Sequence, residues 1–475
     1  MSLNLNQILQ NKYPHLEISV LNLSDAMKDN EKLRIDAEFF QSKFTKLDNL
    51  LSKKNCKNLQ SITKSIRKGI FDISPSHYLE KGIPFLRVQN IQNSFLDTSN
   101  CVFISEEYSK NEFKTELHYG DLALSKVGSV GRFCFITETV NTSQNVTSIK
   151  VNQQEINSHY LFIFLISKYG QMQFERQQSQ QVQSKLELDD IRKTTIPLFP
   201  LSFQQQIEQM VKESHLCLEQ SKALYREAEV LLYRELGLDP ENPLASIETL
   251  SGSLNIAVRT LKESFLDTGR LDSEYYQTKY DEIERIIKNQ KFAKLSDLVD
   301  MQKSIEPGSE AYQENGIPFI RVSNFNKFGI SDTDIFLNQT EFKNAIMPKN
   351  NTILLSKDGS IGTAYCVKDE KDFITSSALL HLNIKNEQSS NILPEYLTLV
   401  LNSILVKLQA ERDSGGSIIA HWRINEIEEI LIPILDISIQ QKIENLIKQS
   451  FMLRGKANDL LLTAKQTVET AIEQG

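Results

Sequence analysis

The stretch SFQQQIEQMVKESHLCLEQSKALYREAEVLLYREL, residues 202–236, has the pattern of one long helix with a narrow apolar stripe. Its apolar and small residues recur at alternating steps of three and four, which is the spacing of a coiled-coil seam and requires a partner helix. The same pattern returns at residues 438–472. We therefore predict that these two helices pair as an antiparallel coiled coil within the chain. The seam positions expected to pair are Ile207, Met210, Leu224, Leu231, Ile443, Leu446, Leu453 and Leu460.

Both stretches also open with the same polar residues. Ser202 is followed by Gln205, and Ser438 is followed by Gln441. In a capping box, the serine oxygen accepts from a free amide of the first turn while the glutamine side chain reaches back. The spacing therefore predicts that each long helix starts at its serine.

The second half of the chain repeats the first. Three segments recur in the same order, at a nearly constant offset, and such self-similarity indicates duplicated domains. Each copy then ends in one of the long helices. The matched segments are 33–51 with 269–287, 82–92 with 316–326, and 120–136 with 350–367.

The fold class that this organisation predicts is α+β. Within each repeat, short runs rich in Val, Ile and Phe are separated by Gly, Pro, Asn and Ser, which is typical of strands in a small curled sheet. A helical return is expected to follow the strands in each copy, at 158–178 and 394–413. The two halves are expected to be related by a pseudo-two-fold axis. The predicted domains are a first mixed domain at 1–200, a first long helix at 201–237, a linker at 238–252, a second mixed domain at 253–436 and a second long helix at 437–475.

Composition limits the function classes. A chain of 475 residues exceeds one ordinary core, and its five scattered cysteines indicate neither a disulfide framework nor a zinc site. The absence of a long apolar run and of a signal-peptide layout predicts a cytoplasmic protein with no membrane partner. The formal charge of −8 argues against bulk attraction to nucleic acid, but residues 53–68 carry six Lys or Arg and no acid. A local basic surface is therefore expected.

One repeated motif places an arginine and an asparagine after an apolar strand. GIPFLRVQN contains Arg87 and Asn90, and GIPFIRVSN contains Arg321 and Asn324. These are the side chains that make bidentate contacts to guanine and adenine edges. A position shared by both repeats equally suits a scaffold role or a phosphate contact, so both interpretations stay open.

A second repeated motif is Ser-Lys-x-Gly-Ser-x-Gly, which starts at Ser125 and at Ser356. Its glycines permit a tight turn, and its serine and lysine suit either a plain hairpin or a phosphate contact. Arg132 follows the motif in the first copy, where the second copy has Thr363. A residue that differs in this way is a candidate for a contact made by one copy only.

Loops that differ between the repeats are where sequence-reading residues are expected, because two domains that read different sequences should differ where they read. For any single loop residue, an ordinary solvated position is an equally valid interpretation. The candidate DNA-binding residues are Lys64, Arg67, Lys68, Arg87, Asn90, Ser125, Lys126, Arg132, Gln181, Gln183, Lys185, Lys303, Arg321, Asn324, Lys327, Ser356, Lys357, His421, Trp422 and Arg423.

Several catalytic motifs are missing from the sequence. It contains no amino-methyltransferase motif, no Gly-x-x-x-x-Gly-Lys-Ser/Thr loop, no His-Glu-x-x-His and no Gly-x-Ser-x-Gly elbow. We therefore expect no catalytic centre and no metal site in this chain.

Taken together, the motifs resemble the specificity subunit of type I restriction-modification systems. The resemblance spans essentially the whole chain and depends on the duplicated Gly-Ile-Pro-Phe-x-Arg-Val, on the turn motif at 120–131 and on Ile-Pro-Leu-Phe-Pro-Leu-x-x-Gln-x-x-Ile at 196–207. The sequence departs from the family pattern at Phe203, which replaces a glutamate, and at Asp436-Ile437, which replaces Pro-Leu.

The resemblance implies a non-catalytic DNA reader with two target-recognition domains, each reading one half of a two-part target on double-stranded DNA. It implies two methyltransferase subunits that use S-adenosylmethionine, and restriction subunits that use ATP and magnesium, with no cofactor bound by this chain. The long helices, each about 50 Å at ~1.5 Å per residue, would set the unread spacer. Two alternatives stay open: a coiled-coil adaptor for protein interactions, and a specificity subunit of a modification-only methyltransferase complex.

Overall fold

The computed structural model divides the chain into two compact units. Unit 1 comprises Met1–Leu218 and Gly455–Gly475, and unit 2 comprises Glu219–Arg454. None of the helices in the part of the chain that the structure describes combines the length and the apolar character that a bilayer crossing requires. The described residues are 2–18, 20–27, 30, 33–178, 185–250, 256–368, 372–414 and 421–474.

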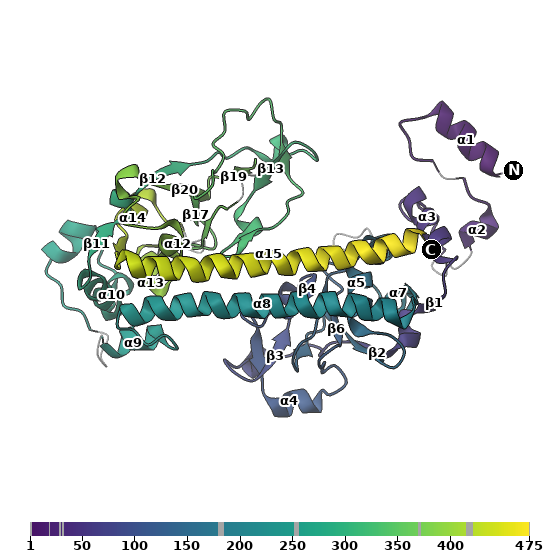
Figure 1. Ribbon diagram of the computed structural model, residues 1–475, viewed down its shortest axis with the longest axis horizontal. Helices are drawn as coiled ribbons and strands as arrows, with labels where there is room; N and C mark the ends of the chain where they lie inside the picture. Colours follow the sequence, from purple (N-terminus) through teal and green to yellow (C-terminus); the bar gives the residue numbers. More distant parts are fainter. Residues whose placement is uncertain are drawn as a thin grey trace. The chain divides into compact units, whose positions relative to one another are not determined.

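Among the residues that the structure describes, the strands of unit 1 form three small sheets. Their strand orders are β2-β9-β6-β7-β4, β5-β3-β8 and β1-β10. Figure 1 labels several of these strands. The strands are β1 (Cys56–Asn58), β2 (Thr63–Lys68), β3 (Ile83–Leu86), β4 (Ser94–Phe95), β5 (Val102–Ile104), β6 (Leu122–Ser125), β7 (Phe133–Phe135), β8 (Asn141–Thr142), β9 (Val146–Val151) and β10 (Thr195–Pro197). The helices besides the two long ones are α1 (Ser2–Lys12), α2 (Leu23–Met27), α3 (Ser42–Leu51), α4 (Glu106–Asn111), α5 (Ser158–Ile166), α6 (Lys168–Gln177) and α7 (Leu188–Lys193).

Unit 2 repeats most of this strand order, with sheets β12-β20-β17-β18, β16-β13-β19 and β11-β21. Among the described residues its largest sheet has no counterpart of β4, and a separate hairpin β14-β15 is present. In both units the central strand of the three-stranded sheet pairs antiparallel with one neighbour and parallel with the other. The repeat inferred from the sequence is therefore a repeat of topology. The strands are β11 (Phe292–Lys294), β12 (Val299–Lys303), β13 (Ile317–Ile320), β14 (Phe325–Asn326), β15 (Gly329–Ile330), β16 (Phe336–Leu337), β17 (Ile353–Ser356), β18 (Ala364–Cys366), β19 (Ile374–Thr375), β20 (Leu379–Ile384) and β21 (Leu431–Pro433). The helices are α9 (Pro243–Leu250), α10 (Thr278–Lys288), α11 (Leu295–Leu298), α12 (Pro394–Asn402), α13 (Ile404–Ser414) and α14 (Ile424–Glu428).

The helical return that the sequence predicted is present in each repeat, and a serine interrupts it. In unit 1 the break falls at Ser167, whose Oγ donates to the Phe164 carbonyl at 2.6 Å. In unit 2 it falls at Ser403, whose Oγ donates to the Val400 carbonyl in the same way. A serine that hydrogen-bonds its own backbone competes with the helical ladder, which explains both breaks. All nine residues of α5 are buried, as expected of a helix that is apolar on every side.

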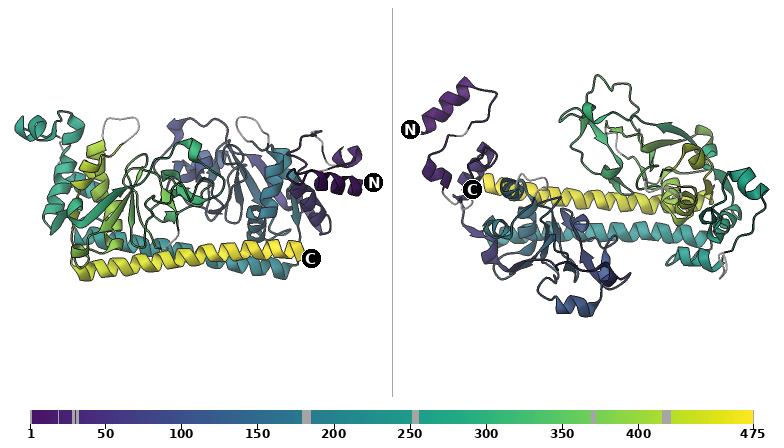
Figure 2. Two further views of the ribbon diagram at one scale, coloured as in Figure 1. Left: turned by 90° about the horizontal axis from the view of Figure 1, so that it is seen from above. Right: turned by 180° about the vertical axis from the view of Figure 1, so that it is seen from behind.

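The two long helices are α8 (Leu201–Glu235) and α15 (Ile437–Gln474), which lie side by side in Figure 1 and in the right view of Figure 2. In unit 1, Ser214 Oγ donates to the Ala457 carbonyl at 2.7 Å. In unit 2, Ser450 Oγ donates to the Ser221 carbonyl at 2.7 Å. The partner number falls as the number along α8 rises, so the helices pair antiparallel, as predicted. Serine and alanine at these positions allow close backbone approach.

The apolar face of each long helix is broader than the predicted seam. Of the predicted pairing positions, Ile207 and Ile443 are fully buried, whereas Met210, Leu224, Leu231, Leu446, Leu453 and Leu460 are only half-buried. Val211 and Leu232, which the seam pattern left out, are fully buried in the cores of units 1 and 2, respectively. Each helix therefore packs against a mixed domain as well as against its partner helix.

The predicted capping boxes are wrong, because α8 and α15 begin one residue before Ser202 and Ser438. The buried glutamine that precedes each predicted partner forms the hydrogen bonds instead. Gln204 accepts from the Asn157 amide at 2.9 Å and donates to the Phe199 carbonyl at 2.8 Å. Gln440 accepts from the Leu393 amide at 3.0 Å and donates to the Asn391 and Leu435 carbonyls. These side chains tie each helix start to its mixed domain.

Candidate nucleic-acid interface

The two repeated Ser-Lys-x-Gly-Ser turns are hairpins whose serines hold the turn together. Ser125 is fully buried between β6 and β7, where its Oγ donates to the Ser129 carbonyl and accepts from the Arg132 amide at 3.2 Å. Ser356 repeats this arrangement in unit 2 with Ser360. These hydroxyls are occupied and inaccessible, so the predicted phosphate contacts by the two serines are wrong. The turn itself requires positive φ at Gly128, Gly131, Gly359 and Gly362.

The lysines of the two turns lie in different electrostatic settings. Lys126 is only 4% exposed. Burial, together with repulsion by Lys68 and Lys185, lowers its pKa to about 8. In unit 2, Lys357 forms an ion pair with Asp358, which also pairs with His421 Nδ1 at 2.7 Å. Burial opposes ionisation of Asp358, but the hydrogen bonds from Lys357 and His421 outweigh it and lower the pKa of that carboxyl.

Asn90 and Asn324 have a structural role at the end of β3 and β13. Asn90 Oδ1 accepts from the Arg87 amide at 3.0 Å, and its Nδ2 donates to the Asn100 carbonyl at 3.2 Å. Asn324 makes the equivalent bonds, at 3.2 Å to the Arg321 amide and at 3.3 Å to a carbonyl. Both ends of each amide are therefore engaged in the 3₁₀ turns Val88–Asn90 and Val322–Asn324. Base reading by these asparagines would require breaking the turn.

The arginines of the same motif differ from the asparagines. The Nε atoms of Arg87 and Arg321 are buried and have no hydrogen-bond partner among the described residues. Burying an N–H group without a hydrogen-bond acceptor costs free energy, and a bound ligand that accepts this hydrogen bond would remove the cost. Arg87 and Arg321 therefore remain candidates for contacts with DNA.

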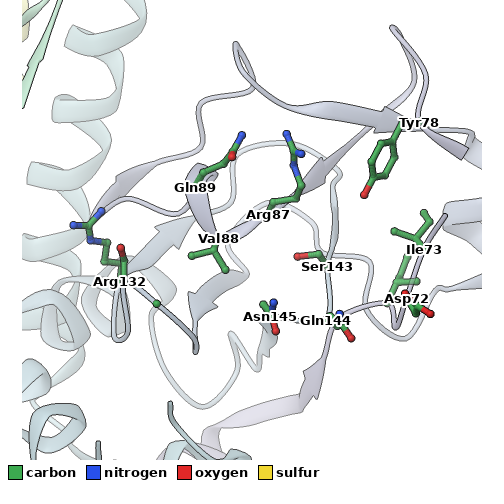
Figure 3. Close-up of a pocket in the computed structure, with 13 residues that line it drawn as sticks. Asp72, Ile73, Tyr78, Arg87, Val88, Gln89, Arg132, Ser143, Gln144 and Asn145 are labelled. Carbon is green, nitrogen blue, oxygen red and sulfur yellow. The ribbon is translucent and has the colours of Figure 1, made fainter. Parts of the chain in front are cut away.

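A concavity of about 600 Å³ in unit 1 brings Arg87 together with residues from three other segments. In Figure 3, Arg87 and Gln89 lie across the hollow from Gln144 and Asn145, Arg132 lies at one end, and Tyr78 lies at the other. Guanidinium and amide groups are the side chains that read base edges in the major groove. The lining residues are Ile70, Asp72, Ile73, Tyr78, Arg87, Val88, Gln89, Gly128, Ser129, Arg132, Ser143, Gln144 and Asn145.

Sequence reasoning missed Gln144 and Asn145 as site residues, although a signal existed. They occupy the turn between β8 and β9, directly after Thr142 and Ser143, which the second copy keeps as Thr375 and Ser376. The second copy then has Ser377 and Ala378 in place of the two amides. Comparison of the repeats inside their shared segments, rather than only in the variable loops, would have found them.

A second, basic surface lies along β2, the edge strand of the five-stranded sheet. A groove of about 280 Å³ there is lined by Lys64, Arg67 and Arg192, and exposed Lys68 ends the strand. Arg192 is already paired with Asp189 at 2.8 Å. Lys64, Arg67 and Lys68 are exposed, as the basic stretch of the sequence predicted, and suit contacts to a phosphate backbone.

The remaining candidates are dispersed. Lys185 is exposed and pairs with Glu187 at 2.9 Å, Lys303 is exposed at the end of β12, and Arg423 is exposed beside Glu426. His421 is exposed and held by Asp358. Gln181 and Gln183 lie outside the described residues.

Two candidates have structural positions that argue against DNA contact. Trp422 is 1% exposed in the core of unit 2, so its prediction as a surface reader is wrong. Lys327 pairs with Glu229 of α8 at 3.2 Å, and its ammonium lies 4.6 Å from the centre of the Tyr225 ring. Both therefore stabilise unit 2. Among the residues that the structure describes, no group of three or more His, Cys, Asp or Glu is arranged to hold a metal ion.

A protein-family comparison gives one match, which covers most of the chain in two copies. The family model is described as the type I restriction modification DNA specificity domain, and it matches residues 51–229 and 287–452. The two matches fall on the two repeats.

Among curated proteins, the type I restriction enzyme EcoBI specificity subunit of Escherichia coli is 24% identical over 143 residues, which are 30% of this chain and 30% of that protein. The alignment therefore spans about a third of the relative. Among solved structures, the S subunit of a type I restriction-modification system from M. genitalium is 14% identical with a TM-score of 0.35, covering 88% of this chain and 93% of that one. The HsdS subunit from Thermoanaerobacter tengcongensis is 13% identical with a TM-score of 0.28, covering 88% and 96%.

Proposed function

Because the chain belongs to the family of type I restriction modification DNA specificity domains, we propose that it is a DNA-recognition subunit whose two units each read one half of a two-part target. The observation that carries this proposal is the concavity of unit 1, where Arg87, Gln89, Arg132, Gln144 and Asn145 converge. The residues that line this concavity supply hydrogen-bond donors and acceptors for base edges, and they are not arranged as a catalytic site. The chain thus selects a site and leaves catalysis to partners.

The division of labour within unit 1 follows from the two surfaces. The amides and guanidinium groups of the concavity discriminate bases, each bidentate contact contributing about 1–3 kcal/mol of discrimination. The lysines and arginine along β2 contact phosphates, which position the domain without reading sequence. Such positioning explains how a chain with net charge −8 binds a polyanion, since its positive charge is local.

Differences between the repeats support separate half-sites. Unit 2 replaces the amides Gln144 and Asn145 by Ser377 and Ala378, and replaces Arg132 by Thr363. It also has an acidic Asp358 in the turn where unit 1 has Val127. Two domains with matching repeats but different side chains at equivalent positions are suited to different base pairs.

The partners in this proposal are two methyltransferase subunits, which use S-adenosylmethionine to methylate adenine within the target. Restriction subunits that use ATP and magnesium complete the complex. In this proposal the long helices α8 and α15 determine the number of unread base pairs. The acidic residues on the outer face of α8 suit contact with the methyltransferases.

The proposal is tested by selection from random duplex DNA with the full chain and the methyltransferase subunit from the same genome. We expect recovered sequences to contain two specified blocks with an unspecified spacer of constant length. A single continuous block would contradict the two-unit assignment, and recovery of no motif at all would favour the protein-interaction adaptor.

A further inference from the structure

A clamped turn that the DNA-reading proposal leaves unused occurs once in each unit. In unit 1, Arg34 Nε donates to the Asp36 carboxylate at 2.7 Å, and Arg34 Nη2 donates to its second oxygen at 2.6 Å. In unit 2, Arg270 grips Asp272 through the same two nitrogens. A bidentate pair of this kind fixes the orientation of both side chains. The paired arginine also lowers the pKa of each carboxyl.

The same arginines anchor their turns to the rest of the unit. Arg34 Nη1 donates to the Arg176 carbonyl at the end of α6, at 3.1 Å. Its guanidinium lies 4.8 Å from the centre of the Phe39 ring, and that of Arg176 lies 4.3 Å from the same ring centre. The aromatic ring is thus held by two cations, each contact being favourable when partly desolvated. Arg176 continues the network through a salt bridge to Asp48 of α3.

Unit 2 repeats most of this network, except that Arg270 Nη1 donates to the Asp413 carbonyl, one residue beyond the equivalent of Arg176. The Tyr275 ring lies 4.7 Å from the Arg270 guanidinium and 5.4 Å from that of Arg412. Arg412 pairs with Glu284 of α10 at 2.6 Å, as Arg176 pairs with Asp48. Backbone geometry is shared as well, because Leu33 and Gly269, which precede the two arginines, both have positive φ. A leucine in that conformation is strained and persists only where its surroundings hold it.

These clamps present an aliphatic side chain to solvent. Ile35 lies between Arg34 and Asp36 and is 79% exposed, and Leu271 lies between Arg270 and Asp272 and is 70% exposed. Single exposed apolar residues are ordinary on a protein surface. A large aliphatic residue whose two neighbours in the chain form an ion pair with each other, at the equivalent position of both repeats, requires a further explanation.

We infer that Ile35 and Leu271 are matched docking points for two copies of one protein partner, each copy receiving the aliphatic side chain in an apolar pocket. The duplication identifies the occupant as a subunit present twice, because one feature reproduced in two units suits two identical partners. This inference builds on the proposed function, in which the subunit present twice is the methyltransferase. The clamp keeps the side chain ordered before binding, which reduces the entropic cost of association.

The test uses the full chain co-expressed with the methyltransferase subunit from the same genome, and native mass spectrometry counts the subunits bound. The variants are Ile35→Glu, Leu271→Glu and the double substitution. We expect two methyltransferase subunits on the unmodified chain, one on each single variant and none on the double variant. The affinity for the lost subunit should fall at least 100-fold, because a buried carboxylate replaces an apolar contact.

Two controls separate docking from folding and from DNA reading. Phe113→Glu changes a residue that is 60% exposed in unit 1 and outside both clamps, and it should keep both subunits. Ile35→Val and Leu271→Met should also keep both, and all variants should melt at the temperature of the unmodified chain. Retention of two subunits by the double variant overturns the inference, as does loss of both subunits from a single variant. DNA binding by the chain alone is scored separately, so failure of DNA reading with intact docking affects only the proposed function.

Discussion

Removal of the positive charges along β2 gives the sharpest prediction about DNA contact. The variant Lys64→Ala, Arg67→Ala, Lys68→Ala deletes three exposed cations from one strand edge. Each phosphate that a cation neutralises contributes about 0.9 to the slope of log K against log salt concentration. Three such contacts therefore predict a slope that is less steep by up to about 2.7, and an affinity near 0.1 M salt that is lower by roughly 100- to 500-fold.

The assay is fluorescence anisotropy with a labelled duplex that contains the selected target, measured across a series of salt concentrations. A matched control is Lys43→Ala, Lys57→Ala, Lys110→Ala, which also removes three positive charges from unit 1. Each of those lysines already pairs with a carboxylate, so the two charges largely cancel and little positive charge is left to attract a phosphate. The control should change the slope of log K against log salt concentration by less than about 0.9, the value for one phosphate contact. Equal slopes for the two triple variants would refute the assignment of β2 as a phosphate-contacting strand.

Three further predictions follow from buried groups and from the long helices. Gln440→Ala should lower the free energy of unfolding by about 3 kcal/mol, because it leaves the part-buried Leu393 amide and Asn391 carbonyl and the buried Leu435 carbonyl without partners. Substitution of the exposed neighbour, Gln441→Ala, should cost less than about 0.5 kcal/mol in the same urea titration. Lys126 in the unfolded chain stays protonated up to its ordinary pKa of 10.5, whereas in the folded chain it loses the proton above about 8. The free energy of unfolding should therefore rise with pH between these two values. Lys126→Met should remove this rise in melting scans. Insertion of four residues into both α8 and α15 should lengthen them by about 6 Å and widen the unread spacer by about one or two base pairs in mapped methylation sites; an unchanged spacer would contradict the role of the helices.

The fold was largely predictable because duplication supplied an internal comparison. The offset between Ser202 and Ser438 placed two equivalent helices, and the strands between them followed from apolar runs bounded by turn residues. The break at Ser167 was not predictable from periodicity, because the side chain of that serine competes with the helix only through a local hydrogen bond. The capping boxes failed for a related reason, since Gln204 is fixed by the Asn157 amide, which lies far away in the sequence.

The candidate site was only partly predictable. Residue type suggested Arg87 and Arg132, which line the concavity, but it equally suggested Asn90, whose side-chain amide is hydrogen-bonded within a turn. Trp422 looked like a surface reader because it follows a variable loop, whereas its side chain completes a core. Sequence indicates which groups are able to bind bases, and only the folded environment shows which of them are still available.

The most direct test of the account is a methylation map of a genome that carries this chain with its methyltransferase, compared with the variant Gln89→Ala, Gln144→Ala, Asn145→Ala. All three amides line the concavity of unit 1, and none lies in unit 2. We expect one half of the methylated motif to become degenerate, while the other half and the spacer length stay unchanged. Degeneracy in both halves, or a motif identical to that of the unmodified chain, would contradict the claim that unit 1 reads one half-site through this concavity.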